Sequence, residues 1–226
     1  MMDIFKEELK KLCPFLSESQ LEKNREYFNI LTEKNKVMNL TRITDEKTAA
    51  ENHFADSLYA AEYIPQNAKV IDVGTGGGFP SVPLAVARED IEMTAIDSVG
   101  KKVNFVAEAC KELGIKINAF PARAEELAKK EFRESFDVCV SRAVADMRVL
   151  AELCLPLVKK GGIFIAYKGE CEEELENAKP AIKALGGKTR EVKTFARHCL
   201  IIVDKISATN IKYPRRYAKI LKEAIK

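Results

Sequence analysis

The most constraining feature of the chain is a glycine-rich loop between an apolar strand and a helix. Residues 70–83 read VIDVGTGGGFPSVP. Three of the first four residues are apolar and β-branched, which predicts a buried strand. Glycine adopts positive φ and lacks a Cβ, so the backbone can turn sharply here and lie against a ligand. Pro80 and Pro83 suit the first turn of a following helix, whose N-terminus offers free N–H donors. The four glycines are Gly74, Gly76, Gly77 and Gly78.

The glycine spacing discriminates among cofactors. A dinucleotide fingerprint, G-x-G-x-x-G, would place its third glycine at position 79, which is Phe79. A P-loop ends in Gly-Lys-Ser/Thr, whereas Gly78 is followed by Phe79 and Pro80. The loop therefore disfavours both a pyrophosphate and the phosphates of ATP or GTP.

Two acidic residues favour a cationic cofactor instead. Asp72 stands two residues before the first glycine, where its carboxylate would repel phosphates. S-adenosylmethionine has no phosphate and carries an ammonium and a sulfonium. The next predicted strand, IEMTAID, ends in Asp97, which is placed to accept hydrogen bonds from both ribose hydroxyls. The pair predicts S-adenosylmethionine, the alternative being a plain glycine turn with Asp97 as a helix N-cap.

Composition limits the other possibilities. With 226 residues and 46% hydrophobic content, the chain can form one main domain and an extension. No apolar run approaches the ~20 residues that span a bilayer, so we expect a cytoplasmic protein without a membrane partner. Six cysteines without a C-x-x-C pair and two distant histidines predict neither a metal site nor a disulfide framework.

The net charge of +3 is too small to indicate a nucleic-acid binder, but its distribution is uneven. From Lys205 to Lys226 there are seven basic residues against the single Glu223. This tail is either a phosphate contact or a solvated amphipathic helix.

The pattern of elements predicts an α/β fold. Residues 1–65 read as a helical extension, with a capping box at Ser17 to Gln20, and residues 66–226 as the cofactor domain. From Lys69 onward short β-branched runs alternate with helices, which predicts a mostly parallel sheet covered on both faces. The predicted strands are 69–73, 92–97, 116–119, 136–140 and 162–167, followed by a hairpin of 189–195 and 199–205.

Ligands of open α/β sheets bind beyond the carboxyl ends of the strands, and three cations fall there. Arg123, Arg142 and Lys168 follow the third, fourth and fifth predicted strands. Their convergence would suit the phosphates of a nucleic acid. Alternatively, each pairs with a nearby carboxylate such as Glu125.

One face of the extension also carries polar groups. His53, Asp56 and Ser57 stand at i, i+3 and i+4 of a predicted helix and so share a face. His53 is either functional or a structural hydrogen-bonding residue.

The residues after the fourth strand bear on the atom that would be methylated. Enzymes that methylate an exocyclic amine commonly carry Asp/Asn-Pro-Pro-aromatic there, where this chain has Ser141-Arg142-Ala143. Methylation at pyrimidine carbon 5 needs a thiolate, but Cys139 lies inside a strand like an ordinary buried thiol. Guanine N7 has an in-plane lone pair and no proton to remove, so positioning suffices. A site without a general base is consistent with that target.

Together these motifs resemble the RsmG (GidB) family, the bacterial 16S ribosomal RNA guanine-N7 methyltransferases. The resemblance implies a class I, Rossmann-like methyltransferase with a mostly parallel seven-stranded sheet. It also implies that the substrate is 16S rRNA or the small ribosomal subunit, and we expect a monomer. The residues that carry it are Asn39-Leu40-Thr41, 53–58 (HFADSL), 72–80 (DVGTGGGFP), Asp97-Ser98, Lys101-Lys102, 123–126 (RAEE), 141–143 (SRA), Lys168-Gly169, Arg197-His198 and 213–215 (YPR).

The resemblance also implies roles for individual residues, with Ala124 and Glu125 beside the adenosine and Asn39 and His53 close to the site. The predicted cofactor-binding residues are Asp72, Gly74, Gly76, Gly78, Phe79, Asp97, Ala124, Glu125 and Arg142. The predicted catalytic residues are Arg142 and Asn39. The predicted RNA-binding residues are Arg123, Lys168 and Arg197.

The chain departs from the family pattern at two places. Ser81 replaces the usual glycine after Phe-Pro, and the tail from Arg216 to Lys219 reads as a continuing helix. Two other functions stay open from the sequence: a nicotinamide-dependent oxidoreductase, and an RNA-binding protein that retains the fold without catalysis.

Overall fold

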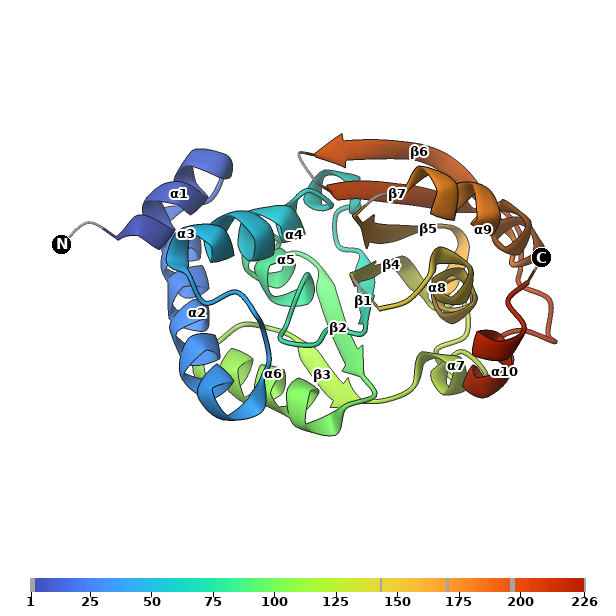
Figure 1. Ribbon diagram of the computed structural model, residues 1–226, viewed down its shortest axis with the longest axis horizontal. Helices are drawn as coiled ribbons and strands as arrows, with labels where there is room; N and C mark the ends of the chain where they lie inside the picture. Colours follow the sequence, from blue (N-terminus) through green and yellow to red (C-terminus); the bar gives the residue numbers. More distant parts are fainter. Residues whose placement is uncertain (1–2, 143, 170, 196–197, 226) are drawn as a thin grey trace.

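The strands of the chain form one mixed sheet with helices on both faces. The computed structural model describes residues 3–142, 144–169, 171–195 and 198–225. Within these ranges seven strands are ordered β3-β2-β1-β4-β5-β7-β6 (Figure 1). The strands are β1 (Lys69–Val73), β2 (Glu92–Asp97), β3 (Asn118–Pro121), β4 (Phe136–Arg142), β5 (Val158–Lys168), β6 (Gly187–Phe195) and β7 (His198–Lys205).

The pairing confirms the predicted fold class. Strands β1 to β5 are parallel, whereas β7 runs antiparallel to β5 and to β6. The predicted bounds of β1 and β2 are correct, but β3 begins two residues later than predicted, at Asn118, which pairs with Thr94. β5 begins at Val158 rather than Gly162, because Val158 pairs with Phe136 across an irregular register.

Alternation along the strands divides the core into two layers. In β4, Val138 belongs to the cluster under the N-terminal helices, and the next residue, Cys139, to the cluster on the opposite face. This period of two is expected for a strand buried on both sides. One face is covered by α5 (Ser81–Ala87) and α6 (Gly100–Glu112). The other carries α7 (Ala124–Leu127), α8 (Met147–Cys154), η3 (Leu155–Leu157), α9 (Glu172–Ala184) and α10 (Tyr217–Lys222).

The N-terminal extension is helical, as predicted, and packs on the sheet domain. Its second helix begins with the predicted capping box, in which Ser17 and Gln20 exchange hydrogen bonds. Phe5 and Phe28 are stacked and belong to the same buried cluster as Val70 of β1. A boundary near residue 65 therefore separates two segments that share one core, and the division into two domains stays a prediction. The elements are α1 (Ile4–Leu12), α2 (Glu18–Met38), α3 (Glu46–Ala49), η1 (Ala50–Ala55), α4 (Asp56–Leu58) and η2 (Ala61–Tyr63).

Helix α2 supports the glycine loop from below. The hydroxyl of Tyr27 is completely buried and donates to the carbonyl of Gly77 at 2.9 Å. The Gln20 amide donates to the carbonyls of Val86 and Ala87 at the end of α5. The extension thus holds both the loop and the helix that follows it.

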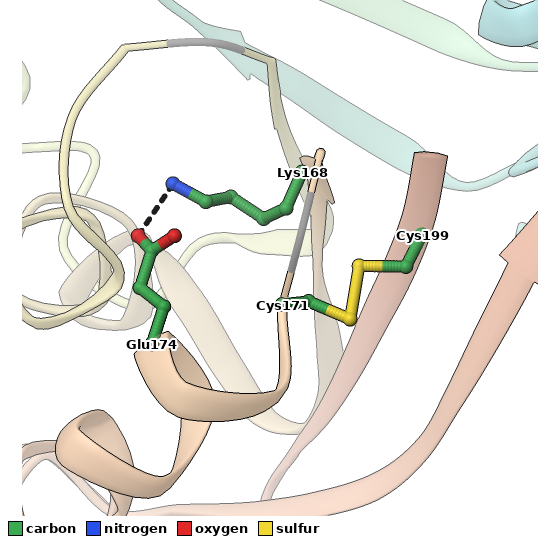
Figure 2. Close-up of a disulfide and its surroundings, with 4 residues drawn as sticks. All are labelled: Lys168, Cys171, Glu174 and Cys199. Carbon is green, nitrogen blue, oxygen red and sulfur yellow. Dashed lines mark ion pairs between the residues drawn. A yellow bond between two sulfur atoms is a disulfide. The ribbon is translucent and has the colours of Figure 1, made fainter. Parts of the chain in front are cut away.

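The cysteine spacing predicted no disulfide framework, and the structure contains a single disulfide among the described residues. Cys171 and Cys199 are bonded, which ties the start of α9 to the start of β7 (Figure 2). Local spacing could not show this pair, because it depends on the antiparallel register that places Lys168 opposite Cys199. Cys171 follows Lys168 by three residues and so reaches the same place. The free cysteines, Cys13, Cys110, Cys139 and Cys154, are buried.

Membrane-spanning helices and metal-binding clusters are both absent from the described ranges. None of the helices found there is long and apolar enough to cross a membrane. Nor do those ranges bring three or more His, Cys, Asp or Glu side chains together in a way that could hold a metal ion.

Candidate cofactor and substrate site

A cavity of about 1210 Å³ opens beyond the carboxyl ends of β1, β2, β4 and β5. The glycine loop forms its floor, the helical extension one wall, and β7 and α10 contribute further side chains. Asp72, Gly78 and Asn39 are absent from its lining among the described residues, and the predicted Arg197 lies outside those residues. The predicted site residues that line it are Gly74, Gly76, Phe79, Asp97, Arg123, Ala124, Glu125, Arg142 and Lys168.

The loop glycines have distinct local roles. Gly74 and Gly76 have φ of +80° and +55°, which disfavour any residue with a side chain. A Cβ on Gly76 would meet nothing within 4 Å, because this residue borders the open cavity. A Cβ on Gly78 would overlap the Tyr27 hydroxyl and a methyl of Val82. Gly76 therefore leaves room for a ligand, whereas Gly78 leaves room for the helix packed beneath the loop.

Asp97 pins the glycine loop to the end of β2. Its Oδ2 accepts from the backbone N–H of Gly76 at 2.9 Å, and its Oδ1 accepts from Val99 at 2.8 Å. The N-cap of α6 is Val99, so the alternative in which Asp97 is an ordinary N-cap is wrong. Each carboxylate oxygen accepts more than one hydrogen bond, so both retain capacity for ribose hydroxyls.

Asp72 lies buried beneath the loop rather than on the cavity surface. Burial raises its pKa to about 6, an effect partly opposed by hydrogen bonds from Thr75 and Ser81. Oδ2 accepts from the Ser81 N–H at 3.3 Å, while Oδ1 has no hydrogen-bond partner among the described residues. The Ser81 hydroxyl also lies 2.6 Å from that of Thr75, so the serine that departs from the family pattern bonds within this network. Because Asp72 does not line the cavity, its carboxylate can favour a cationic ligand there through its charge rather than through a direct contact.

Arg142 is held against the aromatic wall of the cavity. Its Nη1 lies 3.0 Å from Oδ2 of Asp56, and its guanidinium carbon lies 5.2 Å from the centroid of Phe79. His53 stacks on the same Phe79 ring at 4.6 Å, and its Nε2 lies 2.6 Å from the Thr41 hydroxyl. Burial and the neighbouring Arg142 lower the pKa of His53 to about 4, so its imidazole is neutral at physiological pH. The extension therefore supplies His53 and Asp56 to the site, as their shared face suggested.

The other two predicted cations also line the cavity and also have acidic partners. Arg123 lies 3.8 Å from Glu125 and stands over the ring of Tyr217 at 5.8 Å. Lys168 lies 2.5 Å from Glu174, the pair drawn in Figure 2, and donates to the carbonyl of Ala145. The convergence of the three cations is confirmed, and so is the alternative that each pairs with a carboxylate.

Asn39 is not part of the cavity lining, although the residues that follow it are. It ends α2 in the left-handed region, with φ of +51°, and is exposed, whereas the next residues, Leu40 and Thr41, line the cavity. The lining residues that were not predicted as site residues include Tyr217 and His198. The only signal for either was its place in or beside a family motif, because neither follows one of the parallel strands.

The comparisons with known proteins agree with this geometry. A family model described as GidB, rRNA small subunit methyltransferase G, matches residues 20–203. The chain belongs to this family. A GidB relative from Clostridium perfringens, named ribosomal RNA small subunit methyltransferase G, is 42% identical and covers 96% of this chain and 98% of its own. One of the same name from Lachnoclostridium phytofermentans is 44% identical and covers 95% and 93%.

Solved structures confirm the methyltransferase fold. A SAM-dependent methyltransferase from Aquifex aeolicus is 18% identical, with a TM-score of 0.56, and covers 76% of this chain and 96% of its own. M. jannaschii TYW2 in complex with AdoMet is 16% identical, with a TM-score of 0.55, and covers 72% and 76%. As a GidB member with this fold, the chain is a methyltransferase that uses S-adenosylmethionine. Its site fits that cofactor at three points: the acidic side chain of Asp72 beneath the loop, the open face of Gly76 and the carboxylate of Asp97.

Proposed function

We propose that this chain methylates N7 of a guanine in 16S ribosomal RNA, with S-adenosylmethionine as the methyl donor. The observation that carries the proposal is the glycine loop with Asp72 buried beneath it and Asp97 bonded to it, at the floor of a cavity large enough for a donor and a base. Membership in the GidB family supports the rRNA substrate. S-adenosylmethionine supplies an electrophilic methyl group on a sulfonium.

The proposed donor contacts follow the geometry of the loop. Gly74, Gly76 and Phe79 line the floor, and Asp97 accepts hydrogen bonds from the ribose. Ala124 and Glu125 lie at the start of α7, and we assign them to the adenosine end. Asp72 and Gly78 support the donor from beneath the loop, the first through its charge and the second through the room it leaves for α2.

The chemistry needs orientation rather than proton removal. Guanine N7 carries a lone pair, so in-line attack on a sulfonium methyl requires no base. Arg142 at the cavity wall supplies guanidinium donors for the neighbouring O6 of the same base. A covalent route is not supported, since Cys139 is fully buried and its burial raises its thiol pKa well above the usual range.

Further contacts are proposed for the RNA around the target. Arg123, Lys168 and Arg197 are assigned to the RNA, and Asn39 to the neighbourhood of the reacting base. The ion pairs of Arg123 and Lys168 would have to open or be shared for a phosphate contact. We propose that the protein acts as a monomer in the cytoplasm, where its proposed substrate is found.

The test is methyl transfer to defined RNA. Small ribosomal subunits from cells lacking this modification, and naked 16S rRNA, would be incubated with tritiated S-adenosylmethionine. We expect label in the RNA and strand scission at one labelled guanine after borohydride and aniline treatment, which cleaves at N7-methylguanine. Label at an exocyclic amine, or none with either substrate, would contradict the proposal. Arg142→Ala should lose transfer when assayed below its melting temperature, which should itself fall because the buried Asp56 loses an ion-pair partner.

A further inference from the structure

Asp56 is a buried acid of the helical extension that contacts two basic side chains of the sheet. Its side chain is 6% exposed, its Oδ2 lies 3.0 Å from Nη1 of Arg142, and its Oδ1 lies 2.9 Å from Nδ1 of His198. Arg142 ends β4 and His198 begins β7. Three segments far apart in the sequence therefore meet at one carboxylate beside the cavity.

Arg142 is held by its two terminal nitrogens: Nη2 lies 3.4 Å from Nδ1 of His53, and Nη1 makes the other contacts. Besides Asp56, the carbonyls of Asn52 and His53 accept from Nη1, at 3.2 and 3.4 Å. The Phe79 ring lies against the guanidinium and restricts its plane. With Nη1 bound and one Nη2 hydrogen directed at His53, the Nε hydrogen and the second Nη2 hydrogen lie on one edge of the plane and point in a fixed direction. That edge is the one that makes two parallel hydrogen bonds to adjacent acceptors.

The backbone that carries Asp56 is itself fixed. The buried Tyr167 hydroxyl of β5 donates to the carbonyl of Ser57 at 2.6 Å, and the Ser57 hydroxyl donates to the carbonyl of His53. The acid is thus anchored to the sheet next to its partner, so its position relative to Arg142 is set by the fold.

We propose that Asp56 is a positioning residue for methyl transfer, which holds Arg142 by Nη1 so that the Nε–Nη2 edge is presented to the target base. The O6 atom of guanine has two acceptor lone pairs and can accept from this edge, which leaves the neighbouring N7 lone pair free to attack the methyl group. His198 contributes by holding the second oxygen of Asp56. The inference rests on the proposed function and adds that the extension, rather than the sheet domain alone, sets the geometry of the reaction.

The decisive experiment is a double-mutant cycle. Asp56→Asn keeps the size of the side chain and removes its charge, and Arg142→Ala removes the group that it holds. If orientation is lost, we expect kcat for RNA methylation to fall about 10- to 100-fold in Asp56→Asn. The Kd for S-adenosylmethionine should stay within about twofold, because the contacts of Asp56 are to Arg142 and His198 rather than to the loop. In the Arg142→Ala background, Asp56→Asn should cause no further loss of kcat.

A matched control and a second variant complete the design. Asp90→Asn removes an equivalent acid from the Arg88 ion pair, whose residues do not line the cavity, and should leave kcat unchanged. His198→Ala removes a partly exposed side chain (41%) that contacts Oδ1 of Asp56, so this variant should fold. It therefore tests the role of the Asp56 carboxylate even if Asp56→Asn folds poorly. It should lower kcat several-fold, again only when Arg142 is present.

The outcomes separate this inference from the proposed function. The positioning role would be overturned if the decreases in kcat multiply when either variant is combined with Arg142→Ala. It would also be overturned if Asp56→Asn and His198→Ala both keep the wild-type kcat. Full activity of Arg142→Ala would overturn it as well. Absence of methyl transfer by the wild-type protein would instead overturn the proposed function.

Discussion

The raised pKa of the buried Asp72 carboxyl predicts how the unfolding free energy changes with pH. Desolvation raises its pKa from 3.8 to about 6, against the hydrogen bonds from Thr75 and Ser81. The native protein therefore binds a proton at Asp72 more tightly than the unfolded chain does. Its stabilising contribution is fully present below the unfolded pKa and is lost as the pH rises through the folded pKa. A shift of this size corresponds to about 3 kcal/mol of unfolding free energy.

The substitution Asp72→Asn removes this titration and keeps the side-chain shape. Between about pH 4.5 and about pH 7.5, the unfolding free energy of the variant relative to wild type should rise by about 2 kcal/mol. Urea denaturation at several pH values measures both proteins, and the subtraction cancels groups that the variant does not alter. Binding of S-adenosylmethionine should weaken by at least about fivefold, because the charge beneath the loop is gone.

A control separates Asp72 from acids in general. Asp90 is paired with Arg88, which lowers its pKa, so its stabilising contribution is present above the unfolded pKa and is lost only in stronger acid. The difference between Asp90→Asn and wild type should therefore stay nearly flat over the same pH range. A flat profile for Asp72→Asn too would refute the claim that Asp72 carries a proton in the native state at mildly acidic pH.

Four further variants test the loop and the disulfide. Gly76→Ala should lose donor binding measured by calorimetry, since the added methyl faces the cavity, and should be destabilised by about 1–2 kcal/mol because its φ is positive. Gly78→Ala should be destabilised more, because overlap with Tyr27 and Val82 adds to its own positive φ. Equal stability of the two variants would contradict this. Asp97→Ala should weaken donor binding by about 1–3 kcal/mol, and unchanged affinity would remove the ribose assignment. Cys171→Ser should lower the unfolding free energy by about 3–4 kcal/mol in non-reducing buffer, given the 28-residue separation of the bonded cysteines, and not at all under reduction. The last prediction would be contradicted if a thiol assay of the wild-type protein, unfolded without a reducing agent, detected six reactive thiols.

The sequence could predict those parts of the fold and site that depend on local pattern. β1 and β2 are short and mostly apolar runs, and the glycine loop follows β1 directly. Periodicity and glycine spacing therefore located them correctly. Gly74, Asp97 and Arg142 were found because the carboxyl ends of parallel strands lie along one edge of the sheet. The predicted start of β5 was wrong, because the first residue of that strand is set by its pairing with β4 rather than by its composition.

Other site features depend on contacts that no local pattern encodes. Tyr217 reaches the cavity because the tail is fastened to α8, where the fully buried Glu152 pairs with Arg215. That pair also shows that Arg215, one of the basic tail residues, is bound within the protein. His198 and the Cys171–Cys199 bond both follow from the antiparallel return of β7 beside β5. Reversals of this kind are set by tertiary packing of the whole hairpin.

The pairing of charges in the cavity shows how the site can select a base within a polyanion. Arg142, Arg123 and Lys168 each lie within 4 Å of an acid, supplied by α4, α7 and α9 respectively. A cavity lined by such pairs has little excess positive charge to attract phosphate, but its cations are held in fixed orientations. Fixed donors discriminate among base edges, whereas unpaired charge binds any backbone. The exposed basic residues of the tail, which include Lys219 and Lys222, are therefore better placed to supply the general attraction for RNA, and the cavity to choose the guanine.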